Sequence, residues 1–382
     1  MLNPNADKIE IPIIRRTNTG NLHFRIGVCI LLIFLTESLF TGCDIGSGER
    51  FKASFLGLGT LSGFMASRGL GISGNGLVVV GSSFTSNTDL EAFRWTEQSG
   101  MIGLGTLPDT TGSCAEAASI DGSVIAGSST FFDVFVAFRW TAAKGLERLT
   151  PMDEEIQANT ASGISADGTV IVGGAGGALT SKAYRWTEAN GLVTLGTLGG
   201  DTSCAEGVSA DGNVITGSSS NEMGAVLAFR WTSETGMVAL PLLTGAVESA
   251  GFGVSANGNV IVGVSIFPDE NFEATLWNDT GAVGLGTLPG QTVSSALNAS
   301  MDGSVVVGHS SECNGCATVA FIWDEENGMR NLRDVLVSEG LSEKLEGWAL
   351  LEASAISHNG HLITGIAINP DGINEAFIAT LP

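Results

Sequence analysis

Basic residues are scarce in this chain of 382 residues: 17 Lys and Arg stand against 40 Asp and Glu, which gives a formal net charge of -23. Binding to DNA or RNA irrespective of sequence needs clustered basic side chains, so the composition excludes nucleic-acid partners. The chain also lacks the high polarity of a disordered acidic protein, because 43% of its residues are hydrophobic. We therefore expect a buried core and partners that are basic, cationic or uncharged.

Recognisable catalytic signatures are absent as well. The sequence contains no Gly-rich phosphate loop, nucleophile elbow or HExxH zinc motif. We accordingly predict no catalytic residue, no metal and no cofactor. Whether the protein is an enzyme stays open, and the balance favours a non-catalytic role.

No apolar run reaches the ~20 residues that a membrane-spanning helix needs. The longest candidate, Ile26–Leu35, has ten apolar residues and follows Arg15, Arg16 and Arg25. A basic segment before a short apolar run is typical of a secretory signal peptide.

Leu39–Asp44 follows this run and resembles a bacterial lipobox, in which a cysteine is lipidated after cleavage. This interpretation makes residues 1–42 a signal peptide, Cys43 the lipidated first residue, 43–52 a short tether, and 53–382 the folded domain. It predicts an exported, membrane-anchored protein of the cell envelope. The alternative is an ordinary signal peptide with Cys43 incidental, which would give a secreted protein.

From residue 53 onward, one unit repeats seven times. Its first marker is Ser-x-Asp/Asn-Gly, and the Asp/Asn positions are 75, 121, 167, 211, 257, 302 and 359. Its second marker is Ala-Phe-Arg-Trp or a variant, starting at residues 92, 137, 183, 228, 274, 320 and 376. Two markers that keep one period near 45 residues establish the repeat.

Each repeat reads as four short strands. Asp-Gly or Asn-Gly between apolar runs predicts a hairpin with a type I′ turn, in which both central residues have positive φ. A β-branched run follows, and a glycine marks its end: Gly81, Gly127, Gly173, Gly217, Gly263, Gly308 and Gly365. Short strands with frequent turn signals indicate an all-β fold.

Seven four-stranded units of this length predict a seven-bladed β-propeller with antiparallel blades. The domain starts on a fourth-type strand, Phe55–Leu61, and finishes on a third-type strand, Ala376–Thr380. We expect the first strand to complete the last blade and close the ring. An open β-solenoid is the alternative, because periodicity alone does not prove closure.

The repeats resemble the HAF repeats of bacterial extracellular proteins, through units of the form Leu-Gly-Thr-Leu, Ser-x-Asp-Gly-x-Val-Val-Val-Gly and Ala-Phe-Arg-Trp-Thr. The likeness covers roughly residues 53–382. The His of the name-giving His-Ala-Phe triplet is replaced in every unit, by Glu91 in the first and Glu375 in the last. The resemblance implies an exported repeat protein and carries over no active-site residue.

Two repeated polar positions could be functional or structural. Arg94, Arg139, Arg185 and Arg230 could ring an anionic ligand, but packing against an acidic or aromatic neighbour explains them better, since Leu276, Ile322 and Ile378 take the same place. The Asp/Asn turn residues could bind calcium, yet each turn offers one ligand where Ca²⁺ takes ~6–8. Turn chemistry explains them without metal.

The cysteines and histidines supply the remaining candidates. Cys313 and Cys316 suit a local disulfide in an exported chain better than a metal site. Cys114 and Cys204 occupy equivalent places two units apart in Ser-Cys-Ala-Glu, and we expect both to be free and buried.

The seventh unit breaks the pattern with the insertion Arg333–Trp348, and His358 and His361 flank its hairpin. His358, His361 and Trp348 are therefore the candidate ligand residues. The sequence as a whole favours an exported binding module with a protein or glycan ligand. The alternative is a propeller hydrolase or lyase acting on envelope polysaccharide.

Overall fold

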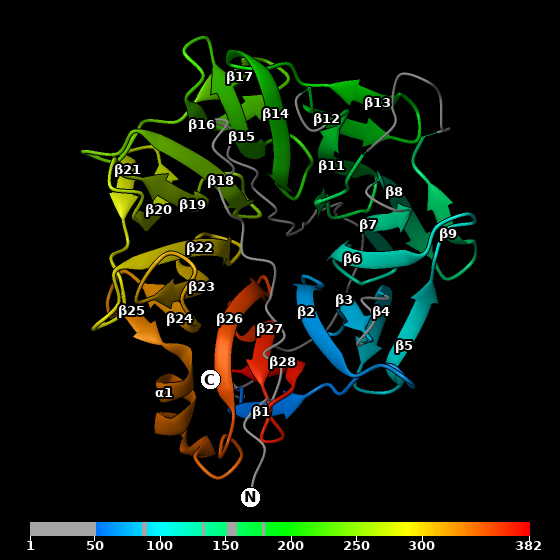
Figure 1. The fold of residues 1–382 in the computed structure, drawn as a ribbon, viewed down its shortest axis with the longest axis vertical. Helices are drawn as coiled ribbons and strands as arrows, with labels where there is room; N and C mark the ends of the chain where they lie inside the picture. The colour runs from blue at the N-terminus through cyan, green and yellow to red at the C-terminus, as the bar shows by residue number, and fades with distance from the viewer. Residues whose placement is uncertain (1–50, 86–89, 132–133, 151–158, 178–179) are drawn as a thin grey trace, which may run out of the picture.

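The computed structural model describes residues 51–85, 90–131, 134–150, 159–177 and 180–382. Seven four-stranded antiparallel sheets stand around a central axis as a β-propeller (Figure 1). The predicted all-β fold, blade number and strand number are therefore confirmed, and the chain is not an open solenoid. In the described part of the chain, no helix combines the length and the apolarity needed to cross a membrane.

Each blade runs from an innermost strand at the axis to an outermost strand at the rim (Figure 1). The innermost strands are β2 (Ala66–Ile72), β6 (Gly112–Ala118), β10 (Gly163–Ile164), β14 (Gly199–Val208), β18 (Glu248–Val254), β22 (Val293–Ala299) and β26 (Ala349–Ile356). The second strands are β3 (Val79–Phe84), β7 (Val124–Phe131), β11 (Val170–Ala175), β15 (Ile215–Asn221), β19 (Ile261–Ile266), β23 (Val305–Ser311) and β27 (Leu362–Ile368).

The third strands carry the Ala-Phe-Arg-Trp marker: β4 (Leu90–Thr96), β8 (Val134–Thr141), β12 (Lys182–Thr187), β16 (Val226–Thr232), β20 (Phe272–Asn278), β24 (Thr318–Asp324) and β28 (Asn374–Thr380). The outermost strands are β5 (Gly100–Gly105), β9 (Gly145–Arg148), β13 (Gly191–Thr194), β17 (Gly236–Ala239), β21 (Gly281–Gly284), β25 (Gly328–Asn331) and β1 (Ser54–Gly57). After β25 come the short helices α1 (Leu332–Leu336) and η1 (Val337–Leu341).

The ring closes as the sequence predicts. The strand β1 from the N-terminal side pairs with β28 from the C-terminal end, in the register Ser54↔Thr380 to Gly57↔Phe377. Phe55 anchors this contact, since its ring lies 5.6 Å from that of Phe377 and 5.0 Å from that of Trp348. The seventh blade thus contains strands from both ends of the propeller domain. This pairing closes the ring.

The core repeats with the sequence marker. In six blades the aromatic residue of the third strand is fully buried: Phe93, Phe138, Tyr184, Phe229, Phe321 and Phe377. Neighbouring blades are also joined by a polar contact that recurs around the ring. A serine at the start of the innermost strand accepts a hydrogen bond from the third-strand alanine of the preceding blade, as in Ala92 N to Ser113 Oγ at 2.9 Å and Ala376 N to Ser67 Oγ at 3.0 Å. Burial and matched hydrogen bonds together fix each blade against the next.

The Ser-x-Asp/Asn-Gly hairpin differs from the predicted type I′ turn. In the first blade, Gly76 has φ of 76°, whereas Asn75 is not among the residues with positive φ. Gly76 N donates to Ser73 O at 2.8 Å, and Asn75 Oδ1 accepts from Ser73 Oγ and from Leu77 N. The Asp or Asn is therefore selected for its side-chain acceptor, which holds the turn, rather than for a left-handed backbone.

Candidate functional site

A β-bulge interrupts the innermost strand of most blades at one equivalent position. The register between the first and second strands skips a residue in six blades: Leu70, Glu116, Glu206, Phe252, Leu297 and Ser354. In the remaining blade, Ser162 holds the same place in front of Gly163. A bulged residue is unpaired in the ladder, so its side chain is free to leave the sheet face.

In blades four and five, the glycine after the bulge lies against the next innermost strand. A Cβ on Gly207 would lie 2.9 Å from Phe252 O, and one on Gly253 would lie 2.8 Å from Leu297 O. The backbones of these strands therefore touch at this level, which only glycine permits. In other blades the same place holds Ala117, Asn298 or Ala355.

The residues at the bulge position are not alike. Blades two to four contribute Glu116, Ser162 and Glu206, whereas blades five and six contribute Phe252 and Leu297, which pack in one apolar cluster. The position is thus polar in some blades and apolar in others. The fold requires neither a polar nor an apolar residue there, because Leu, Glu, Phe and Ser all occur at this position.

The two glutamates are electrostatically unusual. Burial and, to a lesser extent, the charge of Glu116 raise the pKa of Glu206 to about 8, although hydrogen bonds from Cys204 and Ser162 oppose the shift. Burial also raises the pKa of Glu116, against the hydrogen bond to Cys114 and the charge of Arg68. Glu206 is 8% exposed and Glu116 is half-buried. Each carboxyl keeps one oxygen, Oε2, that is buried and has no hydrogen-bond partner.

Cys114 and Cys204 lie beside these carboxyls and, as the sequence suggests, are not joined in a disulfide. Cys114 is buried as predicted, whereas Cys204 is half-buried and the prediction that both are buried is wrong for it. Burial raises the pKa of both thiols, and the adjacent glutamate raises it further. Both side chains are therefore neutral thiols at neutral pH and weak nucleophiles.

A second polar pair lies between blades six and seven. His309 Nδ1 is 3.6 Å from Glu352 Oε2, and Ser354 Oγ donates to Glu352 Oε1 at 2.8 Å. Burial lowers the pKa of His309, although the charge of Glu352 opposes the shift. The imidazole is accordingly neutral at neutral pH, and the pair is not a full ion pair.

The hairpin turns form a closed circle of backbone hydrogen bonds around the axis. Each turn donates an N–H to a carbonyl of the next turn: Asn75 to Ile120, Ile120 to Ala166, Ala166 to Ala210, Ala210 to Ala256, Asn257 to Met301, Met301 to His358, and His358 to Gly74. The N···O distances run from 3.0 to 3.3 Å. His358 therefore has a backbone role in this circle, between the sixth and first blades.

The three candidate ligand residues of the seventh unit do not meet in one site. Trp348 immediately precedes β26 and packs edge-on against Phe55. His358 follows the other end of that eight-residue strand. His361 Nδ1 lies 3.1 Å from Leu381 O, and its ring stacks on Phe51 at 4.5 Å. The structure uses Trp348 and His361 for packing at opposite ends of the blade.

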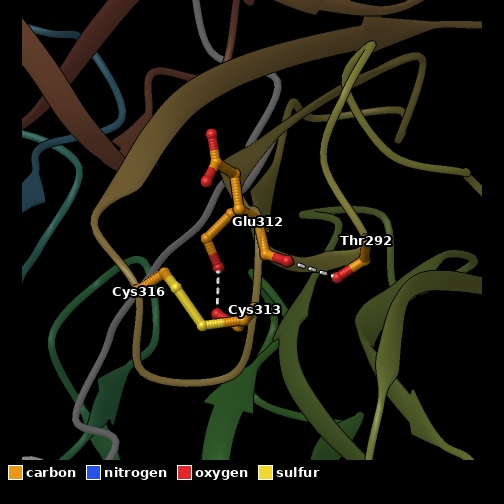
Figure 2. Close-up of a disulfide and its surroundings, with 5 residues drawn as sticks. Thr292, Glu312, Cys313 and Cys316 are labelled. Carbon is orange, nitrogen blue, oxygen red and sulfur yellow. Dashed lines mark hydrogen bonds between the residues drawn. A yellow bond between two sulfur atoms is a disulfide. The ribbon is translucent and has the colours of Figure 1, made fainter.

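Cys313 and Cys316 form a disulfide in the loop between β23 and β24 (Figure 2). Ser311 Oγ donates to Cys313 O at 2.9 Å, and Thr292 Oγ1 donates to Glu312 O at 2.7 Å (Figure 2). The loop is thereby tied both to itself and to the segment before β22. Cys43, the candidate lipidation residue, lies outside the described residues.

The third-strand arginines connect blades. Arg94 Nε donates to Gly122 O at 3.4 Å, Arg185 Nε to Gly212 O at 3.4 Å, and Arg230 Nη1 to Gly258 O at 2.6 Å. In each case the acceptor is the hairpin glycine of the following blade. Arg94, Arg185 and Arg230 therefore hold neighbouring blades together, and Arg139 lies with Arg185 in the lining of a surface hollow. Within the described ranges, no group of three or more His, Cys, Asp and Glu side chains is arranged to hold a metal ion.

The pair of glutamates at the bulge position is the feature that sequence reasoning missed, although a signal for it exists. Ser-Cys-Ala-Glu occurs at 113–116 and again at 203–206. Aligning the units on the hairpin shows that this Glu takes a place held by Leu, Phe or Ser elsewhere. Two of the seven units thus have a charged residue where the others have none. A specialised site requires such a departure from the repeat.

Comparisons with known proteins agree with the fold. No protein-family model and no curated protein matches the chain. Among solved structures, the oligogalacturonate lyase of Vibrio parahaemolyticus matches with a TM-score of 0.57 at 11% identity, over 88% of this chain and 99% of the lyase. An oligogalacturonate lyase in complex with manganese gives 0.54 at 12% identity, over the same shares of the two chains.

TolB from Acinetobacter baumannii gives a TM-score of 0.47 at 14% identity, over 81% of this chain and 65% of TolB. The chain thus spans slightly less than two thirds of that protein. Identities this low show a shared propeller fold and nothing about ligand or reaction.

Proposed function

We propose that this protein is an exported, lipid-anchored binding module of the cell envelope, without catalytic activity. The signal-like segment Ile26–Leu35 and the lipobox-like Leu39–Asp44 support export and anchoring through Cys43. The resemblance of the repeats to HAF units is consistent with an extracellular location.

One observation carries the binding role. The positions that build the ring repeat from blade to blade, whereas the residues at the bulge of the innermost strand differ: Glu116 and Glu206 stand where blade five has Phe252. The fold does not dictate the residue type at this position, so the residues there can differ between blades. Such differences allow a ring of equivalent blades to bind a ligand. The axis of a propeller also brings residues from every blade together, so a ligand there contacts several units at once.

Anchoring is tested by metabolic labelling with palmitate. We expect label on the wild-type chain and none on Cys43→Ala, because the thiol is the acylation site. Cys29→Ala provides a matched control, since this cysteine lies within the apolar run of the signal. Equal labelling of the wild type and Cys43→Ala would overturn the lipid anchor.

Binding and turnover are separated by incubating the purified chain with envelope glycans and with oligogalacturonate, the substrate named for the lyases of similar fold. The proposal predicts that no product forms from any of them. Formation of product that is lost in a His358→Ala, His361→Ala double variant would establish the hydrolase or lyase alternative instead. His309→Ala serves as a histidine control from the neighbouring blade.

A further inference from the structure

We propose that the surface hollow between the second and third blades binds a uronic acid residue of a glycan, with Arg139 and Arg185 holding its carboxylate. This inference goes beyond the proposed function, because it places a site outside the bulge positions and names the chemical class of its ligand. Two of the four repeated arginines thereby share one site.

The hollow joins two blades. Its lining includes Arg139 on β8 and Arg185 on β12, which belong to neighbouring blades (Figure 1). The other lining residues are Trp186 and members of two turns of the third blade, at 168–169 and 187–190. In an antiparallel four-stranded blade these two turns lie at the same end of the sheet. The volume is about 440 Å³, within the range of about 300–1,000 Å³ that small-molecule sites occupy.

Arg139 departs from the other repeated arginines. Those three each donate to the hairpin glycine of the following blade. The equivalent acceptor for Arg139 is Gly168 O, yet no described residue accepts a hydrogen bond from the Arg139 guanidinium. Glu147 lies opposite Arg139 in the pairing of β8 with β9, but its carboxylate pairs with Lys144 at 3.2 Å. The five N–H donors of this half-buried side chain are therefore available to a ligand.

Arg185 supplies the second guanidinium. Its Nε donates to Gly212 O at 3.4 Å, and no described residue accepts a hydrogen bond from its Nη atoms. The nearest turn carboxylate, Asp167, already accepts from Ser165 Oγ at 2.8 Å and from Thr169 N and Oγ1 at 2.9 and 2.7 Å. Asp167 is thus held by its own turn. A guanidinium presents a planar fork of N–H donors that matches a carboxylate, so both arginines suit this ligand group.

The charges around the hollow favour a ligand with a single negative charge. Burial alone would raise the pKa of Asp167, but hydrogen bonds from Thr169 and Ser165 lower it overall, so this carboxylate is ionised at neutral pH. Glu188 also belongs to the lining and is exposed. A ligand carboxylate adds one negative charge beside these two, whereas a phosphate dianion adds two and meets more repulsion.

The rest of the lining suits a sugar ring. Thr169, Thr187 and Asn190 contribute hydroxyl and amide groups, which exchange hydrogen bonds with sugar hydroxyls. Trp186 Nε1 donates to Leu149 O at 2.9 Å, so the indole N–H is already used and the part of the ring that lines the hollow is apolar. Such a surface packs against the C–H groups of a pyranose. A hexuronic acid combines a carboxylate, hydroxyls and an apolar face in one residue.

The test is isothermal titration calorimetry of the purified full-length chain in detergent with methyl β-D-glucuronide. Methyl β-D-glucoside is the matched ligand control, because it differs only in having CH₂OH in place of the carboxylate. We expect saturable binding of the glucuronide and binding of the glucoside that is about tenfold weaker or more, since the glucoside lacks the charged acceptor. Arg139→Gln should weaken glucuronide binding by about tenfold or more, because charge-assisted hydrogen bonds are replaced by neutral ones.

Arg94→Gln is the matched control within the repeat. Arg94 takes the same place in the first blade, donates to Gly122 O and lies outside the lining of the hollow, so this variant should bind as the wild type does. Arg139→Lys keeps the charge but not the fork of donors, and it should also bind the glucuronide more weakly than the wild type. Thermal melting checks that the variants fold.

A titration with inorganic phosphate decides between classes of anion. Phosphate should bind more weakly than the glucuronide, because it carries more negative charge and has no sugar ring. Absence of saturable glucuronide binding, equal binding of the glucoside, phosphate binding as tight as that of the glucuronide, or unchanged binding by Arg139→Gln would each overturn the uronate site. These results are independent of palmitate labelling and glycan turnover, so the site and the proposed function can fail separately.

Discussion

At the scale of single residues, the buried carboxyl of Glu206 makes the free energy of unfolding depend on pH. The pKa of Glu206 is about 8 in the folded chain, whereas an ordinary glutamate has a pKa of 4.5. The cause is burial, which penalises the ionised form. Between these two pH values the folded chain binds more protons than the unfolded chain, so the free energy of unfolding falls as the pH rises. The stabilisation is complete below pH 4.5 and is lost as the pH passes through 8.

We therefore expect Glu206→Gln to remove this contribution to the pH dependence. In the wild type one such group lowers the free energy of unfolding by about 1.4 kcal/mol per pH unit within the window. Urea denaturation at pH 5.0, 6.5 and 8.5 should show a smaller decline in the variant, which becomes the more stable protein at pH 8.5. As a control, Glu97→Gln replaces an exposed glutamate and should follow the wild type. Identical pH profiles for Glu206→Gln and the wild type would contradict the raised pKa.

At the scale of the element, the bulge of the innermost strand determines which residue the second strand can place opposite it. The repeated glycine that the sequence analysis placed at a strand end lies inside the second strand: Gly217 belongs to β15, which continues to Asn221. A Cβ at Gly217 would lie 1.9 Å from Cys204 O on the bulged strand. The glycine is therefore needed for close backbone approach opposite the bulge. The repeat pattern identified the glycine. It could not show that close backbone approach requires it, because the bulge appears only when the strands are paired.

Gly217→Ala should consequently destabilise the propeller by about 2–3 kcal/mol, the usual cost of an overpacked core position. The control is Gly177→Ala, where the nearest atom to an added Cβ is Thr180 Oγ1 at 3.7 Å. That substitution should change the free energy of unfolding by less than about 0.5 kcal/mol. Both are measured by urea denaturation. A Gly217→Ala midpoint equal to that of the wild type would show that the innermost strand can shift to make room.

At the scale of the whole molecule, the sequence was sufficient for blade number, strand number and ring closure. Two markers in one register define the repeat, and the strand types at residues 55–61 and 376–380 are complementary. The buried glutamates were beyond this reasoning, because repeat analysis emphasises what the units share. Glu116 and Glu206 differ from their equivalents, and only the strand pairing shows that both occupy the bulge of an innermost strand.

Closure can be tested by joining the ends of the ring covalently. Ser54 and Thr380 are directly opposed in β1 and β28, and Ser54 Oγ donates to Thr380 Oγ1 at 3.0 Å. The double variant Ser54→Cys, Thr380→Cys should form a disulfide on air oxidation, which peptide mapping by mass spectrometry detects. The cross-link should raise the free energy of unfolding by about 2–4 kcal/mol through the entropy of the unfolded chain. Ser54→Cys alone is the control, and failure to cross-link would mean that the ends are not paired.

The circle of hydrogen bonds through the seven hairpin turns has an electrostatic consequence. All seven N–H groups donate in the same rotational sense, from each blade to the next and from the last to the first. Dipoles arranged head to tail around a closed loop cancel as vectors, unlike the aligned peptides of a helix, which leave a partial charge at each end. The turns thus surround the opening without imposing a backbone potential on it. The field that an approaching ion meets there is set by side chains, and four of the seven turns carry an aspartate: Asp121, Asp167, Asp211 and Asp302.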